Sequence, residues 1–351
     1  MTSLPNIISR KGPELRKVFP VPAQPAPRSR IAGAAPWLVA ACIVGYALFA
    51  GGYPATVVGF ALIYAIFVSG LNIFMGLTAQ VSFGQSAFAA VGGYASAILT
   101  TQYEWGWLPA MAAGILAALA AAFAIGYPTL RLKGHYLSMA TLAIGLIAHE
   151  IAVEWESVTM GYLGISGIPP IDIAGYELAS DRAVLIMLSL CVAATVFAVA
   201  RIRSSRLGRA FAGLAGSEDA ARALGIDVAR YKLVSFLLAA AFASFSGSLF
   251  VHVVGYVSPE VFSLHMVILS FTMLYVGGIG TVAGPVIGAL VVSVLPETFR
   301  AFRDYQDLAY GTALILLLIF APRGLAGLFA ALDRKPAASP GRDGGKGEPA
   351  P

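Results

Sequence analysis

Charged residues are scarce in this chain. Only 12% of its 351 residues are Asp, Glu, Lys or Arg, whereas 58% are hydrophobic, and the mean hydropathy is +0.79. Not one charged residue occurs between Arg30 and Glu104. The hydrocarbon core of a bilayer is about 30 Å thick and takes about 20 apolar residues per helix. The composition therefore excludes a soluble domain, and the length of the apolar runs excludes barrel strands, which leaves an all-α polytopic membrane protein.

Cysteines, phosphate-binding loops and metal-ligand patterns are few or missing. Cys42 and Cys191 both fall inside predicted spans, which argues against a disulfide framework or a metal cage. Lys133 and Lys346 lack the preceding glycines and the following Ser or Thr of a phosphate-binding loop. We therefore expect no cofactor, no metal and no ATP hydrolysis on this chain. The net charge of +5 indicates basic cytoplasmic loops rather than a nucleic-acid partner.

About ten helical spans fit between two polar tails. Residues 1–30 predict a disordered basic cytosolic tail, residues 31–325 a transmembrane domain, and residues 326–351 a second disordered cytosolic tail. The predicted spans are Ala35–Gly51, Pro54–Met75, Val81–Thr101, Leu108–Tyr127, Tyr136–Val153, Arg182–Ala200, Leu233–Val257, Val261–Val276, Pro285–Arg300 and Leu308–Ala321.

The basic residues predict the orientation of these spans. Cytoplasmic loops carry an excess of Lys and Arg. With the N-terminus inside, only Arg182, Arg300 and Arg303 lie outside, so twenty of the 23 Lys and Arg residues lie in the cytoplasm. Because ten is an even number, both termini are expected to be cytoplasmic.

The longest basic interval between two spans is the loop 201–232, between the sixth and seventh spans. It contains the signals of a short cytoplasmic helix. Ser217 is a suitable N-cap, and Glu218 and Asp219 follow in the first turn, where the helix dipole favours acidic groups. The helix continues through Ala220 and Ala221, and Gly225 is a natural stop.

This loop and several other stretches resemble one family of membrane proteins. The matching stretches are Glu218-Asp219-Ala220-Ala221 with Gly225, Gly76–Gln80, Ser82–Gly84, Pro128–Gly134, Gly255–Glu260, Gly277–Thr281, Leu295–Glu297 and Pro322–Leu325. Together they resemble the second permease type of the branched-chain amino-acid ABC importers, over about Leu71–Leu325.

The resemblance implies a function, a set of partners and a location. It implies the transmembrane permease subunit of an ATP-driven importer in the inner membrane of a bacterial cell. Cytosolic ATPase subunits would bind ATP and contact the helix Ser217–Gly225. The other implied partners are a second related permease chain, a periplasmic or lipid-anchored solute-binding protein, and the lipid of the membrane. The solute would be a branched-chain amino acid or a similar small polar molecule.

Polar residues within the spans are candidates for the transport path. His149, Glu150, His252 and His265 are ionisable, and such groups in spans are often functional. They are expected either to line an outer vestibule or to face the outer headgroup region. Asn72 and Gln85, with Ser86 beside Gln85, are expected either to line the inner half of the path or to form bonds between helices.

Several alternatives stay open at the level of sequence. The sequence departs from the family pattern around Leu146, His149 and Thr159–Leu163, which leaves room for another solute, such as urea or a short amide. A proton-coupled secondary transporter would use His149 and Glu150 as a relay. A membrane scaffold without transport is a third alternative. The outer loop Glu154–Asp181 is either a plain connector or a surface for docking or gating, and its length favours docking or gating.

Overall fold

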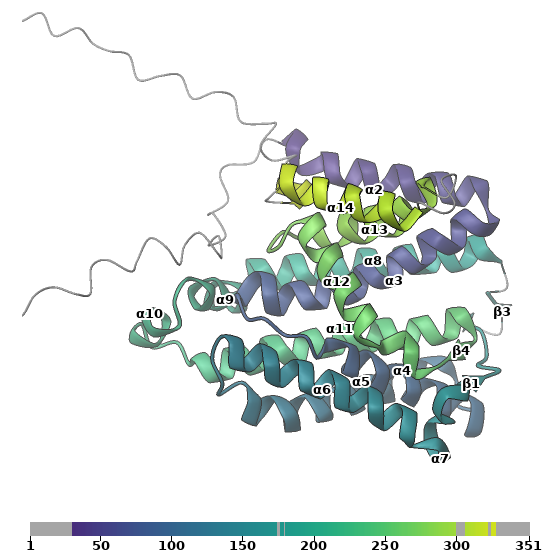
Figure 1. The fold of residues 1–351 in the computed structure, drawn as a ribbon, viewed down its shortest axis with the longest axis horizontal. Helices are drawn as coiled ribbons and strands as arrows, with labels where there is room; N and C mark the ends of the chain where they lie inside the picture. Colours follow the sequence, from purple (N-terminus) through teal and green to yellow (C-terminus); the bar gives the residue numbers. More distant parts are fainter. Residues whose placement is uncertain (1–29, 174–175, 179, 300–305, 322–323, 328–351) are drawn as a thin grey trace, which may run out of the picture.

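The structure is a computed structural model that describes residues 30–173, 176–178, 180–299, 306–321 and 324–327 (Figure 1). Most of both predicted tails lies outside these residues. The helices are α2 (Arg30–Ala50), α3 (Gly52–Asn72), η1 (Ile73–Leu77), α4 (Gln85–Gln102), α5 (Trp107–Thr129), α6 (His135–Glu154), α7 (Glu156–Thr159), η2 (Gly161–Leu163), α8 (Asp181–Ser204), α9 (Arg206–Gly216), α10 (Glu218–Ala223), α11 (Val228–Val254), η3 (Pro259–Phe262), α12 (Leu264–Gly277), α13 (Gly284–Thr298) and α14 (Gln306–Phe320). The strands are β1 (Ile165–Ser166), β2 (Asp172–Ile173), β3 (Tyr176–Glu177) and β4 (Tyr256–Val257).

Each predicted span overlaps a helix, and the described chain is a helical membrane protein with several spans. Within the described residues, six helical segments are long and apolar enough to cross a membrane: Gly52–Leu77, Trp107–Thr129, His135–Glu154, Asp181–Ser204, Val228–Val254 and Pro259–Gly277. The number of ten spans and the orientation of the termini stay predictions.

Some predicted boundaries were wrong by several residues. The third span was predicted from Val81, but α4 begins at Gln85 after a non-helical stretch. The seventh was predicted to reach Val257, but α11 ends at Val254. Gly255 takes a left-handed conformation with φ 73° and donates its N–H to the Val251 carbonyl, which closes the helix.

Helices α3 and α11 form the centre of the bundle, with α4, α5, α8 and α13 packed around them. Small residues allow the closest approach between helices in lipid. At the α4–α11 contact, a side chain on Gly92 would clash with Ser244, and one on Gly247 would clash with the Ala89 carbonyl. By contrast, α5 and α6 lie at the periphery, with about a fifth of their apolar segments buried.

The two ends of the bundle are built differently (Figure 1). Helices α9 and α10 project at one end, which we call the α10 end. The opposite end, which we call the β1 end, carries α7 and the short antiparallel pair β1–β4, in which Ile165 lies opposite Val257. The outer loop of the sequence prediction is therefore folded in its described parts, where Tyr256 Oη donates a hydrogen bond to the Leu163 carbonyl at 3.0 Å.

Candidate functional site

The short helix α10 is formed by local signals at both of its ends. Ser217 is extended, and its hydroxyl accepts a hydrogen bond from the Ala220 N–H at 3.3 Å. Gly225 follows the helix with φ 80°, a conformation that glycine adopts without steric cost. Ala221 packs under the helix in a small apolar cluster with Leu214 and Val228. The sequence therefore fixes where α10 begins and ends, and the cluster fixes which face is buried.

The carboxylate of Glu218 points into the protein. Its Oε1 lies 2.5 Å from Lys232 Nζ of α11 and accepts a hydrogen bond from Gln80 Nε2 at 3.1 Å. The exposed fractions of the two charged side chains are only 19% for Glu218 and 3% for Lys232. A buried ion pair needs both partners, because removal of one leaves an uncompensated charge. Glu218 is thus an internal attachment of α10 to the bundle.

Sequence reasoning missed Lys232 and Gln80. A signal for Lys232 was present, because it is the last charged residue before the uncharged run Leu233–Pro259. A cation at the start of a membrane span invites a search for its counter-ion. No comparable signal existed for Gln80, which is 138 residues away from Glu218 in the sequence.

Gln80 lies in the break between the π-helical turn η1 and α4. Such turns of π-helix occur often at functional positions. The Thr78 hydroxyl donates to the Phe74 carbonyl at 2.5 Å, and the Gln80 N–H donates to the same carbonyl at 3.3 Å. The break is therefore an ordered structure, and Glu218 connects α10 both to it and to α11.

The other face of α10 is open. Asp219 is 81% exposed, and it pairs with Arg222 at 3.0 Å and Lys133 at 3.9 Å. Exposed pairs of this kind contribute little to stability. Ala220 is also exposed, and Leu224, just after the helix, is 82% exposed. The α10 end thus presents a short helix with charged and apolar side chains free for contact with another protein.

The candidates Asn72, Gln85 and Ser86 are all buried. Asn72 bonds between helices, because its Nδ2 donates to the Thr281 carbonyl and its Oδ1 accepts from the Gly280 N–H, both at 2.8 Å. It therefore holds the turn between α12 and α13 against the end of α3. The Gln85 amide has no hydrogen-bond partner among the described residues.

The four ionisable candidates differ in burial and in their hydrogen-bond partners. His252 lies in the core at 3% exposure, where its Nε2 bonds with Ser96 Oγ and its Nδ1 with the Pro169 carbonyl, both at 2.9 Å. His149 Nδ1 is 3.2 Å from the Pro259 carbonyl. Glu150 and His265 are exposed. Within the described chain, no hydrogen bond or ion pair joins any two of the four, and a shared vestibule stays a prediction.

Comparison with known proteins identifies the family. Residues 53–321 match the model of a family described as "Branched-chain amino acid transport system / permease component". The chain belongs to this permease family. The family resemblance of the loop 201–232 and of the other motifs is thereby confirmed.

Three relatives show where the chain falls within the permease family. The high-affinity branched-chain amino acid transport system permease protein LivM of Escherichia coli K12 is 34% identical, over 75% of this chain and 68% of the relative. LivH of the same organism, which carries the same description, is 26% identical over 75% of this chain and 91% of LivH. BraD of Pseudomonas aeruginosa, which has the same description, is 27% identical over 75% of this chain and 91% of BraD. No solved structure matches the chain. Among these relatives the chain is LivM-like, a permease subunit of a transport system.

Proposed function

We propose that this permease is the transmembrane subunit of an ATP-driven importer in the inner membrane of a bacterial cell. The observation that carries the proposal is α10, a capped helix that is open on one face and attached by Glu218 to the bundle on the other. The excess of Lys and Arg in the loop 201–232 supports a cytosolic α10 end, where ATPase subunits would bind.

The contacts of Glu218 suggest how ATPase motion reaches the membrane. An ATPase would bind the open side of α10 through Asp219, Arg222 and Leu224. Displacement of α10 would then pull on Lys232 of α11 and on Gln80 ahead of α4. Because α4 and α11 pack closely against each other, both helices would move together. A second related permease would complete the path, and a solute-binding protein would deliver the solute at the β1 end.

The ATPase contact can be tested by purification of the tagged protein from its native membrane in mild detergent. Wild type is expected to bring an ATPase and a second permease with it. Leu224→Asp places a charge on the open side of α10 and should release the ATPase, while Glu218→Lys should do so by detaching α10. The matched control is Leu163→Asp at the β1 end, which is 85% exposed and should retain the ATPase. Equal retention in all variants would contradict the proposed contact.

The solute is proposed from the relatives, whose names describe branched-chain amino acid transport. Uptake of labelled leucine into cells should depend on this chain and should be competed by isoleucine and valine. Competition by urea or short amides alone would assign the transporter to those solutes. Uptake that a protonophore abolishes and ATP depletion spares would instead support a proton-coupled transporter.

A further inference from the structure

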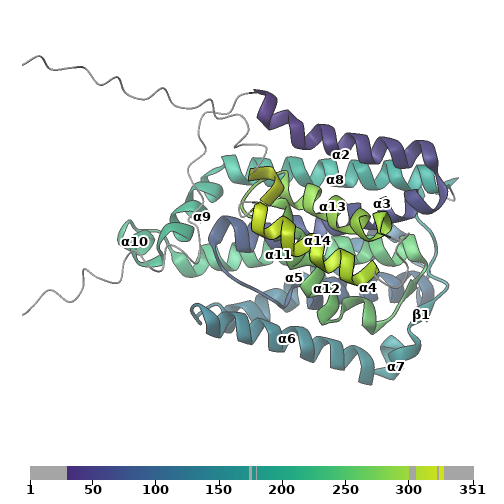
Figure 2. The ribbon, with the colours of Figure 1, turned by 45° about the horizontal axis from the view of Figure 1, so that its top comes forward.

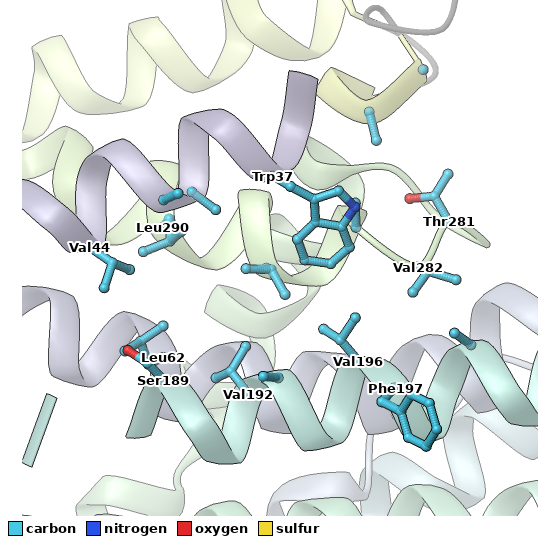
Figure 3. Close-up of a pocket in the computed structure, with 18 residues that line it drawn as sticks. Trp37, Val44, Leu62, Ser189, Val192, Val196, Phe197, Thr281, Val282 and Leu290 are labelled. Atoms are coloured by element: carbon cyan, nitrogen blue, oxygen red, sulfur yellow. The ribbon is translucent and has the colours of Figure 1, made fainter. Parts of the chain in front are cut away.

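Helices α2 and α8 lie on one side of the bundle (Figure 2). A crevice is lined by both of them, and parts of α3 and α13 form its floor (Figure 3). Its volume is about 900 Å³, within the range of ligand-binding sites. Along α8 its wall consists of Ser189, Val192, Ala193, Val196, Phe197 and Ala200. These residues span eleven helical steps, or about 16 Å at 1.5 Å per residue. The crevice is therefore about as long as one leaflet of the bilayer core is thick.

The crevice offers almost nothing to a polar ligand. Among the described residues its lining holds no charged side chain, and the two hydroxyl groups of that lining already donate within the protein. Ser189 Oγ donates to the Leu185 carbonyl at 2.7 Å, and Thr281 Oγ1 donates to the Gly278 carbonyl at 2.8 Å. A zwitterionic amino acid or urea would lose its hydration without replacement, which costs free energy. A hydrocarbon chain has no polar groups whose hydration would be lost, and its apolar character matches that of the lining.

One end of the crevice differs from the rest. Trp37 and Thr281 lie together at this end in Figure 3, and the indole N–H is a polar atom suited to the headgroup level of a membrane. Phe197 also lines this end, and the guanidinium carbon of Arg201 lies 5.9 Å from the centre of its ring. Arg201 is exposed in the last turn of α8, close to the basic loop that leads to α10. An anionic group at this end would meet a positive charge.

We propose that the crevice binds an acyl chain of an anionic phospholipid from the leaflet at the α10 end, with Arg201 beside the phosphate of its headgroup. The crevice is thus a lipid site and not part of the solute path. The turn held by Asn72 contributes Thr281, Val282 and Ala283 to the wall, so a bound chain would pack against the connection between α12 and α13. Lipid binding does not depend on the proposed import function, since it needs only this chain in a membrane.

The test is native mass spectrometry of the detergent-purified full chain, titrated with phosphatidylglycerol or with phosphatidylcholine of the same acyl chains. Wild type should bind phosphatidylglycerol more tightly. Ala193→Trp fills the crevice and should weaken binding about tenfold, which corresponds to the loss of about two buried CH₂ groups. Ala194→Trp is the matched control, because Ala194 is an exposed neighbour outside the lining. Arg201→Gln should remove most of the preference for phosphatidylglycerol.

Either of two results from the titrations would overturn the proposal. Equal binding by Ala193→Trp and Ala194→Trp would mean that lipid lies on the general surface and not in the crevice. Equal binding of both lipids by wild type would remove the role of Arg201. A phospholipid with a photoreactive acyl chain gives an independent test on wild-type protein, which avoids any folding defect of the variants. Its crosslinks should map to α2 and to the lining face of α8, and crosslinks confined to α5 and α6 would contradict the site.

Discussion

Each end of α11 carries a buried polar residue, but the two residues have different kinds of partner. Lys232 and His252 are both almost completely buried. They are twenty residues apart, which corresponds to about 30 Å along a helix, the thickness of the bilayer core. Lys232 is held by the charged partner Glu218, whereas His252 bonds with the Ser96 hydroxyl and the Pro169 carbonyl.

The difference shows which end of the helix is suited to transmit movement. His252 bonds directly to Ser96 of α4, whereas Lys232 is connected to Gln80, ahead of α4, only through Glu218. The bonds of His252 join elements within the bundle. The ion pair of Lys232 joins the bundle to α10, whose other face is open. A force on α10 would therefore enter the α4–α11 pair through the ion pair, while His252 holds the opposite end.

The largest loss of stability is expected when one partner of the Glu218–Lys232 ion pair is removed. Lys232→Met leaves the Glu218 carboxylate buried without its counter-ion, which should destabilise the protein by about 3–5 kcal/mol. The measurement is the free energy of unfolding in detergent, together with ATPase retention. The double variant Lys232→Met/Glu218→Gln should recover most of the stability, because no charge is then left unpaired. Arg230→Met, an exposed change two residues away, is the control. Failure of the double variant to recover stability would contradict the account of Glu218 as a paired internal charge.

A smaller effect is expected at the other end of α11. His252→Ala removes two hydrogen bonds and leaves a cavity, which should cost about 2–3 kcal/mol. Ser96→Ala removes one of the bonds and should cost about 1 kcal/mol. Thermal unfolding measures both, and uptake should fall with the stability of the folded protein. If His252→Ala abolished uptake at full stability, His252 would act on the solute and not as an attachment.

Asp219→Asn tests whether the open face of α10 contributes less to stability than the buried face. Asp219 and Glu218 are adjacent and carry the same group, but Asp219 is 81% exposed and its ion pairs are solvated. Its replacement should change stability by less than about 1 kcal/mol, whereas a change at Glu218 should be severe. The unfolding free energies of Asp219→Asn and Glu218→Gln provide the comparison. Equal losses would mean that burial does not distinguish the two carboxylates.

The smallest effect on stability is expected for Glu150→Gln. Glu150 is exposed, and the described structure gives its carboxylate no hydrogen bond or ion pair, so folding and membrane insertion should be unchanged. Uptake then becomes a direct test of an outer vestibule at this position. Lower uptake with normal insertion would support the vestibule, and unchanged uptake would leave Glu150 as a surface group.

Much of this arrangement could be predicted because it depends on local sequence. Runs without charge place the helices, and Ser217 and Gly225 bound α10 through their own backbone preferences. The direction of the Glu218 side chain could not be predicted, since it depends on Gln80 and Lys232 of other segments. The residues Ser82, Gly84, Gln85 and Ser86 indicated a partly re-entrant start of the third span, but they could not predict that the helix begins only at Gln85. The preceding segment is held by another element, since Thr141 Oγ1 of α6 accepts a hydrogen bond from the Phe83 N–H at 3.1 Å.

The sequence by itself determined that this is a helical membrane protein of the permease family, with a short capped helix after Gly216. Only the tertiary structure decided which faces of those helices meet each other, which faces are exposed, and where the crevice beside α8 lies. The reason is that lipid tails are as apolar as a protein core, so both faces of a membrane helix are built from the same residues. In such a chain, polar groups that point into the bundle, such as Glu218, Lys232, Asn72 and His252, reveal their roles only when their partners are brought beside them.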